Sequence, residues 1–177
     1  IPRDAAAEWL QSEEEKGHRV LGVSYDDGTG AHFGGFVSFV DRIKDSTIAT
    51  VAAAKQMNVA ITVITGDALK VAEAVGREAG LVTESAEVTE AAAFLTLPQA
   101  ERKKRLSSIR VFARTTPEQK LELIQLLKEQ FTVGYLGEGI NDAPALKAAH
   151  VSMVVQSAAD VARETADIVL LQNDLRV

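Results

Sequence analysis

The segment TVGYLGEGIND, residues 132–142, decides the expected fold. Its first half, residues 132–136, is a short and mostly apolar run, which is typical of a strand covered on both faces. Its second half has glycines on both sides of Glu138 and a second carboxylate at Asp142. In α/β sheets, ligands bind at the carboxyl ends of the strands. The segment therefore predicts such a sheet, with a binding site directly after this strand.

The same strand pattern recurs along the chain. Apolar runs alternate with helical segments from about residue 34 onward, at residues 36–40, 59–64, 109–113, 132–136, 151–155 and 168–171. This alternation predicts an α/β fold with a mostly parallel sheet. Residues 1–33 read as a helix, a strand and an Asp-Gly turn. We therefore expect two units, residues 1–33 and residues 34–177.

Composition excludes several classes of protein. The chain has 177 residues, a formal net charge of −6 and no cysteine. The acidic balance argues against a general nucleic-acid binder, which needs a basic surface. The absence of cysteine excludes disulfides, a thiol nucleophile and a cysteine-based zinc site. No apolar run approaches the roughly 18 residues that a membrane span needs.

A second polar strand end lies at residues 65–67. The run at residues 59–64 is followed by Thr65, Gly66 and Asp67. A hydroxyl, exposed amides and the start of a helix together can bind a phosphoryl group. The alternative is that Asp67 only caps the following helix.

Two further features complete a predicted phosphoryl site. Glu138 and Asp142 can hold a hard cation such as Mg²⁺, although an acidic turn before a helix is the alternative. Lys120 lies about one turn into the helix that follows the strand at residues 109–113, and Thr116 and Gln119 form a capping box at the start of that helix. Its amine could reach a phosphate, whereas most helix lysines are simply solvated. Phosphoryl transfer depends mainly on positioning and charge neutralisation, which these groups supply.

Three motifs together resemble a known family. The sequences TGD (65–67), FARTTPEQK (112–120) and GEGINDAPALK (137–147) resemble the phosphorylation domain of P-type cation-transporting ATPases, which belong to the haloacid dehalogenase (HAD) superfamily. The match runs from about residue 34 to the C-terminus. It implies a three-layer, Rossmann-like α/β fold with helices on both faces of a mostly parallel sheet.

The resemblance also assigns roles to residues. It implies a catalytic set that contacts the phosphoryl group, neutralises its charge or shapes the pocket: Thr65, Gly66, Asp67, Lys120, Asn141 and Asp142. It implies Mg²⁺ and ATP as cofactors, with Glu138 and Asp142 as metal ligands. Glu138 stands where the family usually has aspartate, so its carboxylate reaches one methylene further.

Weaker matches lie upstream. The sequence DRIK (41–44) resembles the family's Asp-Pro-Pro-Arg/Lys hinge with both prolines replaced, which implies a cofactor-binding role for Asp41 and Lys44. The sequence HRVL (18–21) resembles the last strand of the nucleotide-binding domain. By that match, Arg19 would contact a phosphate of ATP, and residues 1–33 would be the tail of that domain.

One family motif is absent from these 177 residues. The Asp-Lys-Thr-Gly-Thr sequence that carries the phosphorylated aspartate does not occur, so no residue here is named as the phosphate acceptor. By resemblance it would supply the first, central strand of the sheet, between the strands at residues 59–64 and 132–136. We expect its absence to leave two open edges. The N-terminal strand, a second copy of the chain or a rearrangement could fill the gap.

The sequence thus predicts a catalytic fragment of a P-type ATPase from the cytoplasmic side of an integral membrane protein. Its expected partners are ATP and the rest of the transporter: the upstream phosphorylation segment and the nucleotide-binding, actuator and membrane domains. We expect the fragment to be soluble, to bind no nucleic acid and to be inactive alone. A soluble HAD-family phosphatase or phosphotransferase and a non-catalytic HAD-like binding module are the alternatives.

Overall fold

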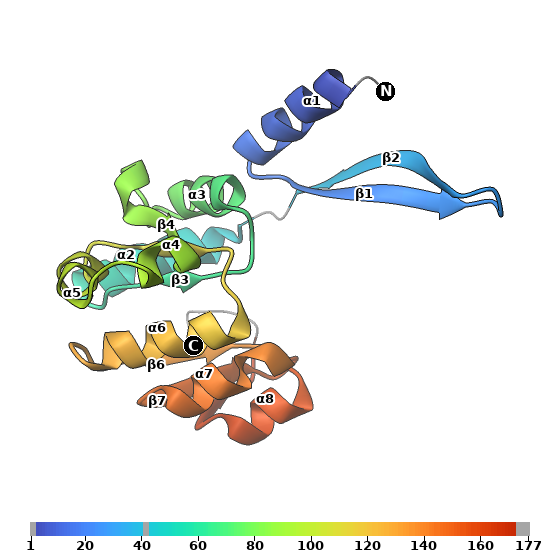
Figure 1. Cartoon of the computed structure of the whole chain (residues 1–177). Helices are drawn as coiled ribbons and strands as arrows, with labels where there is room; N and C mark the ends of the chain where they lie inside the picture. Colours follow the sequence, from blue (N-terminus) through green and yellow to red (C-terminus); the bar gives the residue numbers. More distant parts are fainter. Residues whose placement is uncertain (1–2, 41–42, 173–177) are drawn as a thin grey trace.

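The computed structural model describes residues 3–40 and 43–172 of the chain. Its N-terminal part consists of helix α1 (Arg3–Glu15) and an antiparallel hairpin of β1 (Arg19–Asp26) and β2 (Ala31–Phe39). Figure 1 shows the hairpin extending away from the elements that follow it in the chain. Helix α1 packs on one face of it, where Trp9 stacks on Phe36 with ring centroids 5.6 Å apart.

The hairpin corrects one strand prediction. Residues 36–40 were expected in the parallel sheet, but residues 36–39 belong to β2 and pair with β1. The Asp-Gly turn explains the difference, because Asp26 and Asp27 accept backbone hydrogen bonds from Gly28 and Thr29 and so reverse the chain. Strand β2 also crosses residue 33, the expected end of the N-terminal unit. The division of the chain into two units remains a proposal.

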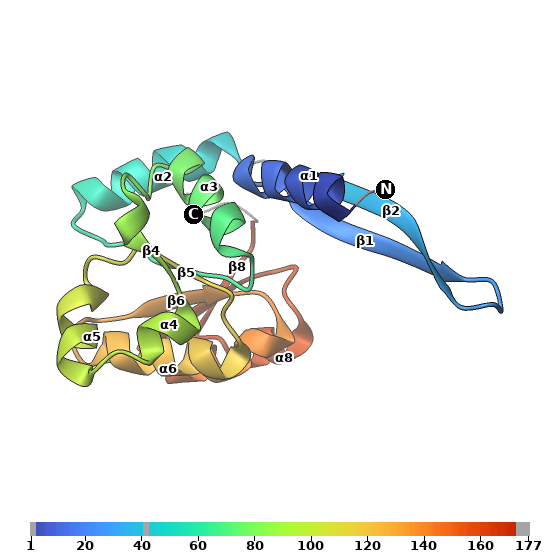
Figure 2. The ribbon, with the colours of Figure 1, turned by 45° about the horizontal axis from the view of Figure 1, so that its top comes forward.

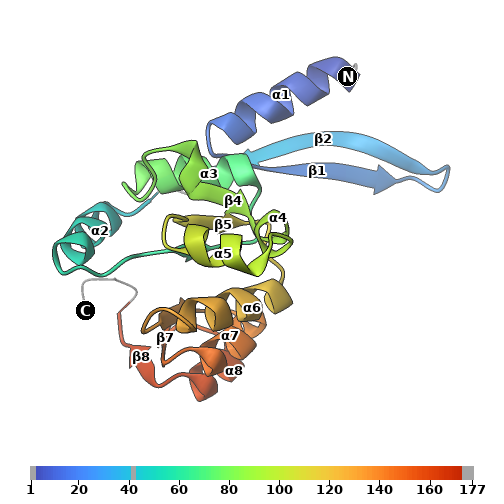
Figure 3. The ribbon, with the colours of Figure 1, turned by 60° about the vertical axis from the view of Figure 1, so that its left-hand side comes forward.

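The other strands form two parallel sheets of three strands each. The first has the order β3-β5-β4, with β3 at Val63–Ile64, β4 at Val88–Glu90 and β5 at Val111–Ala113. The second has the order β6-β7-β8, with β6 at Gly134–Gly137, β7 at Val151–Val155 and β8 at Ile168–Leu170. Figure 3 shows these two groups of strands apart from each other. The expected α/β class and parallel pairing are confirmed.

Helices cover both sides of these strands. They are α2 (Asp45–Gln56), α3 (Leu69–Glu78), α4 (Ala91–Leu95), α5 (Gln99–Leu106), α6 (Pro117–Lys128), α7 (Ala143–Ala148) and α8 (Asp160–Thr165), with 3₁₀ turns at Ser85–Glu87 and Ile140–Asp142. Figure 2 shows α2 and α3 on one side of the strands and α6 and α8 on the other. The structure has the capping box predicted for α6, because Thr116 and Gln119 each accept a hydrogen bond from the other's amide.

Helix α6 joins the cores of the two sheets. Leu123 packs with Phe94 and Phe112 under the first sheet, whereas Ile124, its neighbour in sequence, packs with Val154 under the second. All five of these side chains are almost fully buried. Lys120 lies one turn earlier on the same helix. The helix therefore packs against both sheets, and Lys120 lies on this shared helix.

Strands β3 and β6 are the sheet edges on either side of the expected gap. Within the described residues, β3 pairs only with β5 and β6 only with β7. Strand β3 is also shorter than the strand predicted at residues 59–64, because residues 59–62 pair with no strand in the described part of the chain. The N-terminal strand does not fill the gap, because β1 pairs with β2. Among the described helices, none is long and apolar enough to cross a membrane.

Candidate functional site

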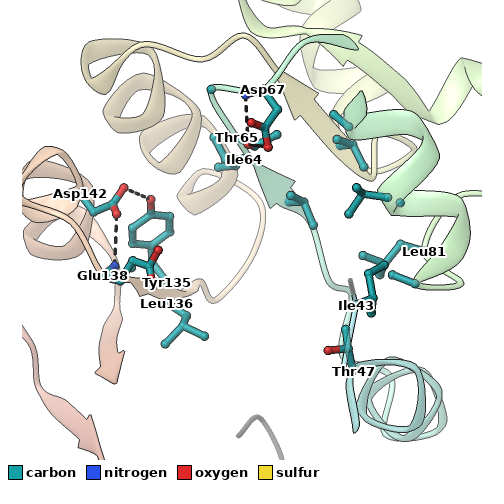
Figure 4. A pocket seen from close by; sticks show the side chains of 18 of the residues that line it. Ile43, Thr47, Ile64, Thr65, Asp67, Leu81, Tyr135, Leu136, Glu138 and Asp142 are labelled. Atoms are coloured by element: carbon teal, nitrogen blue, oxygen red, sulfur yellow. Dashed lines mark hydrogen bonds between the residues drawn. The ribbon is translucent and has the colours of Figure 1, made fainter. Parts of the chain in front are cut away.

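A cavity of about 620 Å³ opens between β3 and β6. Figure 4 shows Ile64, Thr65 and Asp67 on one side of it and Leu136, Glu138 and Asp142 facing them from the other. The structure therefore brings together most of the predicted site residues. Those that line the cavity are Thr65, Gly66, Asp67, Lys120, Glu138, Asp142 and, from the start of α2, Lys44.

The loop after β3 is held by a local network. The Thr65 hydroxyl donates to Asp67 Oδ2 at 2.8 Å, and the Asp67 amide donates back to Thr65 Oγ1 at 3.2 Å. Backbone bonds from Thr65 to Phe112 and from Thr115 to Thr65 tie the loop to β5. The alternative that Asp67 caps the next helix is wrong, because α3 begins after Ala68 with no side-chain cap.

Asp67 also contacts the N-terminal part of the chain. Its Oδ1 atom lies 2.7 Å from a guanidinium nitrogen of Arg19, the first residue of β1. Nearby, Gly17 has φ +79° and approaches α3 so closely that an added Cβ would lie 3.0 Å from the Ala74 Cβ. Arg19 therefore contacts the site through Asp67, although it is not itself among the residues that line the cavity.

The opposite wall of the cavity is built around Asp142. Lys120 Nζ lies 2.7 Å from Asp142 Oδ1, and the Tyr135 hydroxyl donates to the same oxygen at 2.9 Å. The amides of Glu138 and Gly139 donate to Oδ2 at 3.2 and 3.1 Å. Burial raises the pKa of the Asp142 carboxyl, but the hydrogen bonds from Lys120, Gly139 and Tyr135 outweigh it and hold that pKa below its usual value.

Sequence reasoning missed Tyr135. Its side chain is almost fully buried, and burial, followed by the charge of Asp142, raises the pKa of its hydroxyl. Alternation along β6 was the available signal, because Tyr135 and Gly137 point to the same face of the strand. Gly137 is required there, since an added Cβ would lie 2.8 Å from the Asp142 Cβ.

The structure places Asn141 away from the cavity. Asn141 is exposed on the 3₁₀ turn and is not among the residues that line the cavity. Asp41 lies outside the described residues, so only Lys44 of the predicted hinge pair is located. Glu138 is exposed at the cavity, with its backbone amide committed to Asp142.

The residues in this arrangement do not by themselves make a Mg²⁺ site. The four hydrogen bonds to Asp142 occupy the roughly four lone-pair positions of its carboxylate. No group of three or more histidine, aspartate or glutamate residues within residues 3–40 and 43–172 could hold a metal ion. Glu138 alone is too few oxygen ligands for Mg²⁺, which binds in an octahedral shell.

Comparisons with known proteins agree with the fold. The family model described as haloacid dehalogenase-like hydrolase matches residues 3–150. The Magnesium-transporting ATPase, P-type 1 of Salmonella typhimurium (strain LT2) is 40% identical over 156 residues, which are 88% of this chain and 17% of that protein. The Zinc-transporting ATPase of Bacillus subtilis (strain 168) is 32% identical over 175 residues, 98% of this chain and 22% of that protein.

A solved structure matches over the same extent. A crystal structure of a zinc-transporting PIB-type ATPase in the E2P state superposes with a TM-score of 0.67 and 25% identity, covering 99% of this chain and 24% of that one. The chain thus spans about a fifth of the length of these relatives.

Proposed function

The chain belongs to the haloacid dehalogenase-like hydrolase family, and we propose that it is the catalytic part of a P-type cation-transporting ATPase that follows the phosphorylated aspartate. In this proposal it comprises most of the phosphorylation domain and the end of the nucleotide-binding domain, on the cytoplasmic side of the membrane. Its similarity to magnesium- and zinc-transporting ATPases supports the assignment.

The observation that carries this proposal is the meeting of three strand ends at one cavity. Thr65 and Gly66 lie on one wall, and Lys120, held by Asp142, lies on the other. A phosphoryl group between them would find a hydroxyl, backbone amides and an ammonium ion. Such preorganised donors stabilise charge that develops during phosphoryl transfer. Asn141 has no support from its position, which is exposed and outside the cavity lining.

The proposed strand carrying the aspartate would lie between β3 and β6. Among the strands of residues 3–40 and 43–172, none pairs with either edge on that side, and the cavity separates the two edges. A parallel strand there would place its carboxyl end beside Thr65 and Glu138. It would also bring the further oxygen ligands that Mg²⁺ needs beside Glu138. A strand from a second copy of the chain is the alternative occupant, and it would make the 177-residue chain dimeric.

Arg19 and Lys44 are the proposed contacts for ATP, together with Asp41. Arg19 is paired with Asp67, which lines the cavity, so a nucleotide phosphate would have to replace or share that carboxylate. Lys44 lines the cavity from the start of α2. The remaining proposed partners are the actuator and membrane domains of the same transporter.

The test is Mg²⁺-dependent phosphorylation by ATP. The 177-residue chain is compared with a longer chain of the parent protein that includes an upstream Asp-Lys-Thr-Gly-Thr segment. We expect phosphate incorporation only in the longer chain. Hydrolysis of small phosphate esters by the 177-residue chain would favour a HAD phosphatase instead. Failure of the longer chain to incorporate phosphate would favour a non-catalytic binding module.

A further inference from the structure

Asp142 has no carboxylate position left for a metal ion, and Tyr135 is one reason. We infer that Tyr135 is a positioning residue: its hydroxyl fixes the Asp142 carboxylate so that Asp142 orients the Lys120 ammonium rather than ligating a cation. The inference deepens the proposed function and rests on it for its catalytic meaning. The hydrogen bonds among Tyr135, Asp142 and Lys120 on which it depends lie within this chain.

The hydrogen bonds define the orientation of the carboxylate. Oδ2 receives the amides of Glu138 and Gly139, which fixes one end of the group to the backbone of the turn after β6. Oδ1 then points toward α6, where it receives both the Tyr135 hydroxyl and Lys120 Nζ. An ionised carboxylate offers about four acceptor positions, so these donors saturate it.

Tyr135 is rigidly placed for this task. It lies on β6 with only 9% of its surface exposed. The backbone at Gly137 packs against its ring, since a Cβ there would lie 3.1 Å from Tyr135 Cε1. A tyrosine has few rotatable bonds, so its hydroxyl holds the oxygen at little cost in side-chain entropy. The hydroxyl therefore restricts the carboxylate to the direction in which Lys120 meets it.

Lys120, Glu138 and Asp142 have different roles at the cavity. An ammonium has three N–H groups, so Lys120 keeps donors for a phosphoryl oxygen while one is held by Asp142. Glu138 is exposed at the cavity. Of the two predicted metal ligands, Glu138 and Asp142, it is therefore the one that can face a cation. Asp142 then contributes by orienting the Lys120 ammonium.

A double-mutant cycle in the 177-residue chain tests the coupling. The variants are Tyr135→Phe, Lys120→Met and the pair together, with unfolding followed in urea without ATP or Mg²⁺. If Tyr135 aims Asp142 at Lys120, Lys120→Met should raise the unfolding equilibrium constant about tenfold in the wild-type background but less than about threefold in the Tyr135→Phe background. Tyr25→Phe, an exposed tyrosine of the hairpin, is the matched control and should leave the Lys120→Met effect unchanged.

Hydrogen exchange supplies a local readout that a general loss of stability would not imitate. In Tyr135→Phe, the amides of Glu138 and Gly139 should exchange several-fold faster, because the freed carboxylate can turn away from them. The Thr65 amide, which donates to Phe112 in the other sheet, should be unchanged. A Lys120→Met effect that stays at about threefold or more in the Tyr135→Phe background, or uniform exchange changes, would overturn the inference and leave the proposed function intact. Absence of phosphorylation in the longer chain would instead overturn the proposed function and leave the coupling of Tyr135, Asp142 and Lys120 intact.

Discussion

Arg19 at the start of β1 and Asp67 in the loop after β3 form an ion pair of 2.7 Å that joins the N-terminal hairpin to the cavity. The arginine side chain is 54% exposed, so solvent screens the pair and we assign it less than about 1 kcal/mol. The close approach of Gly17 to α3 carries more of the docking, because it depends on packing and backbone conformation.

Gly17→Ala should therefore destabilise the chain more than its matched control, Gly28→Ala. Both glycines have positive φ, at +79° and +89°, so both substitutions incur strain of about 1 kcal/mol. Only the Cβ at position 17 meets another atom, the Ala74 Cβ at 3.0 Å. We expect a further loss of about 1 kcal/mol at position 17, measured by urea unfolding. Equal losses would show that Gly17 does not dock the hairpin.

Gly137→Ala should disturb the Asp142 wall. The new Cβ would lie 2.8 Å from the Asp142 Cβ and 3.1 Å from Tyr135 Cε1, so buried atoms must move. A loss of about 1–3 kcal/mol is the usual effect of such overpacking. Gly139→Ala is the control, because the nearest atom to its added Cβ would be Asp142 Oδ2 at 3.5 Å, an ordinary contact distance. Urea unfolding of both variants decides the point, and a larger loss at position 139 would contradict the packing described.

Acid should destabilise the chain partly through Glu13. Hydrogen bonds from Lys16, Ser38 and His18 lower the pKa of Glu13 from its ordinary value of 4.5 to about 2. Because the unfolded state binds more protons between these values, this stabilisation is present above about pH 4.5 and is lost as the pH falls toward 2. Glu13→Gln should flatten the pH dependence of stability in that window.

Glu8→Gln is the control for that pH effect, since Glu8 is exposed on the same helix. Unfolding midpoints measured from pH 5 to pH 2 would separate the two variants. A Glu13→Gln chain whose stability falls with pH as steeply as the wild type would contradict the assignment.

Lys120→Met should slow phosphorylation of the longer chain by about 10²–10³-fold. The ammonium is held at the cavity by Asp142, and loss of one such charge-stabilising group typically lowers rates by about 10²–10³-fold. Lys55→Met, an exposed lysine in the last turn of α2, should leave the rate of phosphate incorporation within about twofold. The rate is followed with radiolabelled ATP. Comparable rates in both variants would remove Lys120 from the site.

Much of the fold follows from local signals in the sequence. The cap of α6 was predictable because Thr116, Pro117 and Gln119 satisfy the helix end among themselves. The parallel strands were predictable because burial on both faces leaves continuous apolar runs. The placement of residues 36–39 was not, since an apolar run does not say whether a hairpin turn or a helix supplies its neighbour.

The site was harder to predict from the sequence than the fold. Thr65, Lys120 and Asp142 were identified from their positions at strand ends, and the structure places them at one cavity. The partners of Asp67 were not readable, because Arg19 reaches it through the docking of a separate hairpin. Tyr135 escaped notice because an aromatic residue in a strand usually belongs to the core, and only tertiary packing brings its hydroxyl to Asp142.

The central claim is that this chain completes a phosphorylation domain whose acceptor aspartate precedes residue 1. The most direct measurement is mapping of the phosphorylated residue in the longer chain after incubation with ATP and Mg²⁺. We predict a single hydroxylamine-labile phosphate on the aspartate of an upstream Asp-Lys-Thr-Gly-Thr segment. Phosphate on a residue of the 177-residue chain, or none on the longer chain, would contradict the account.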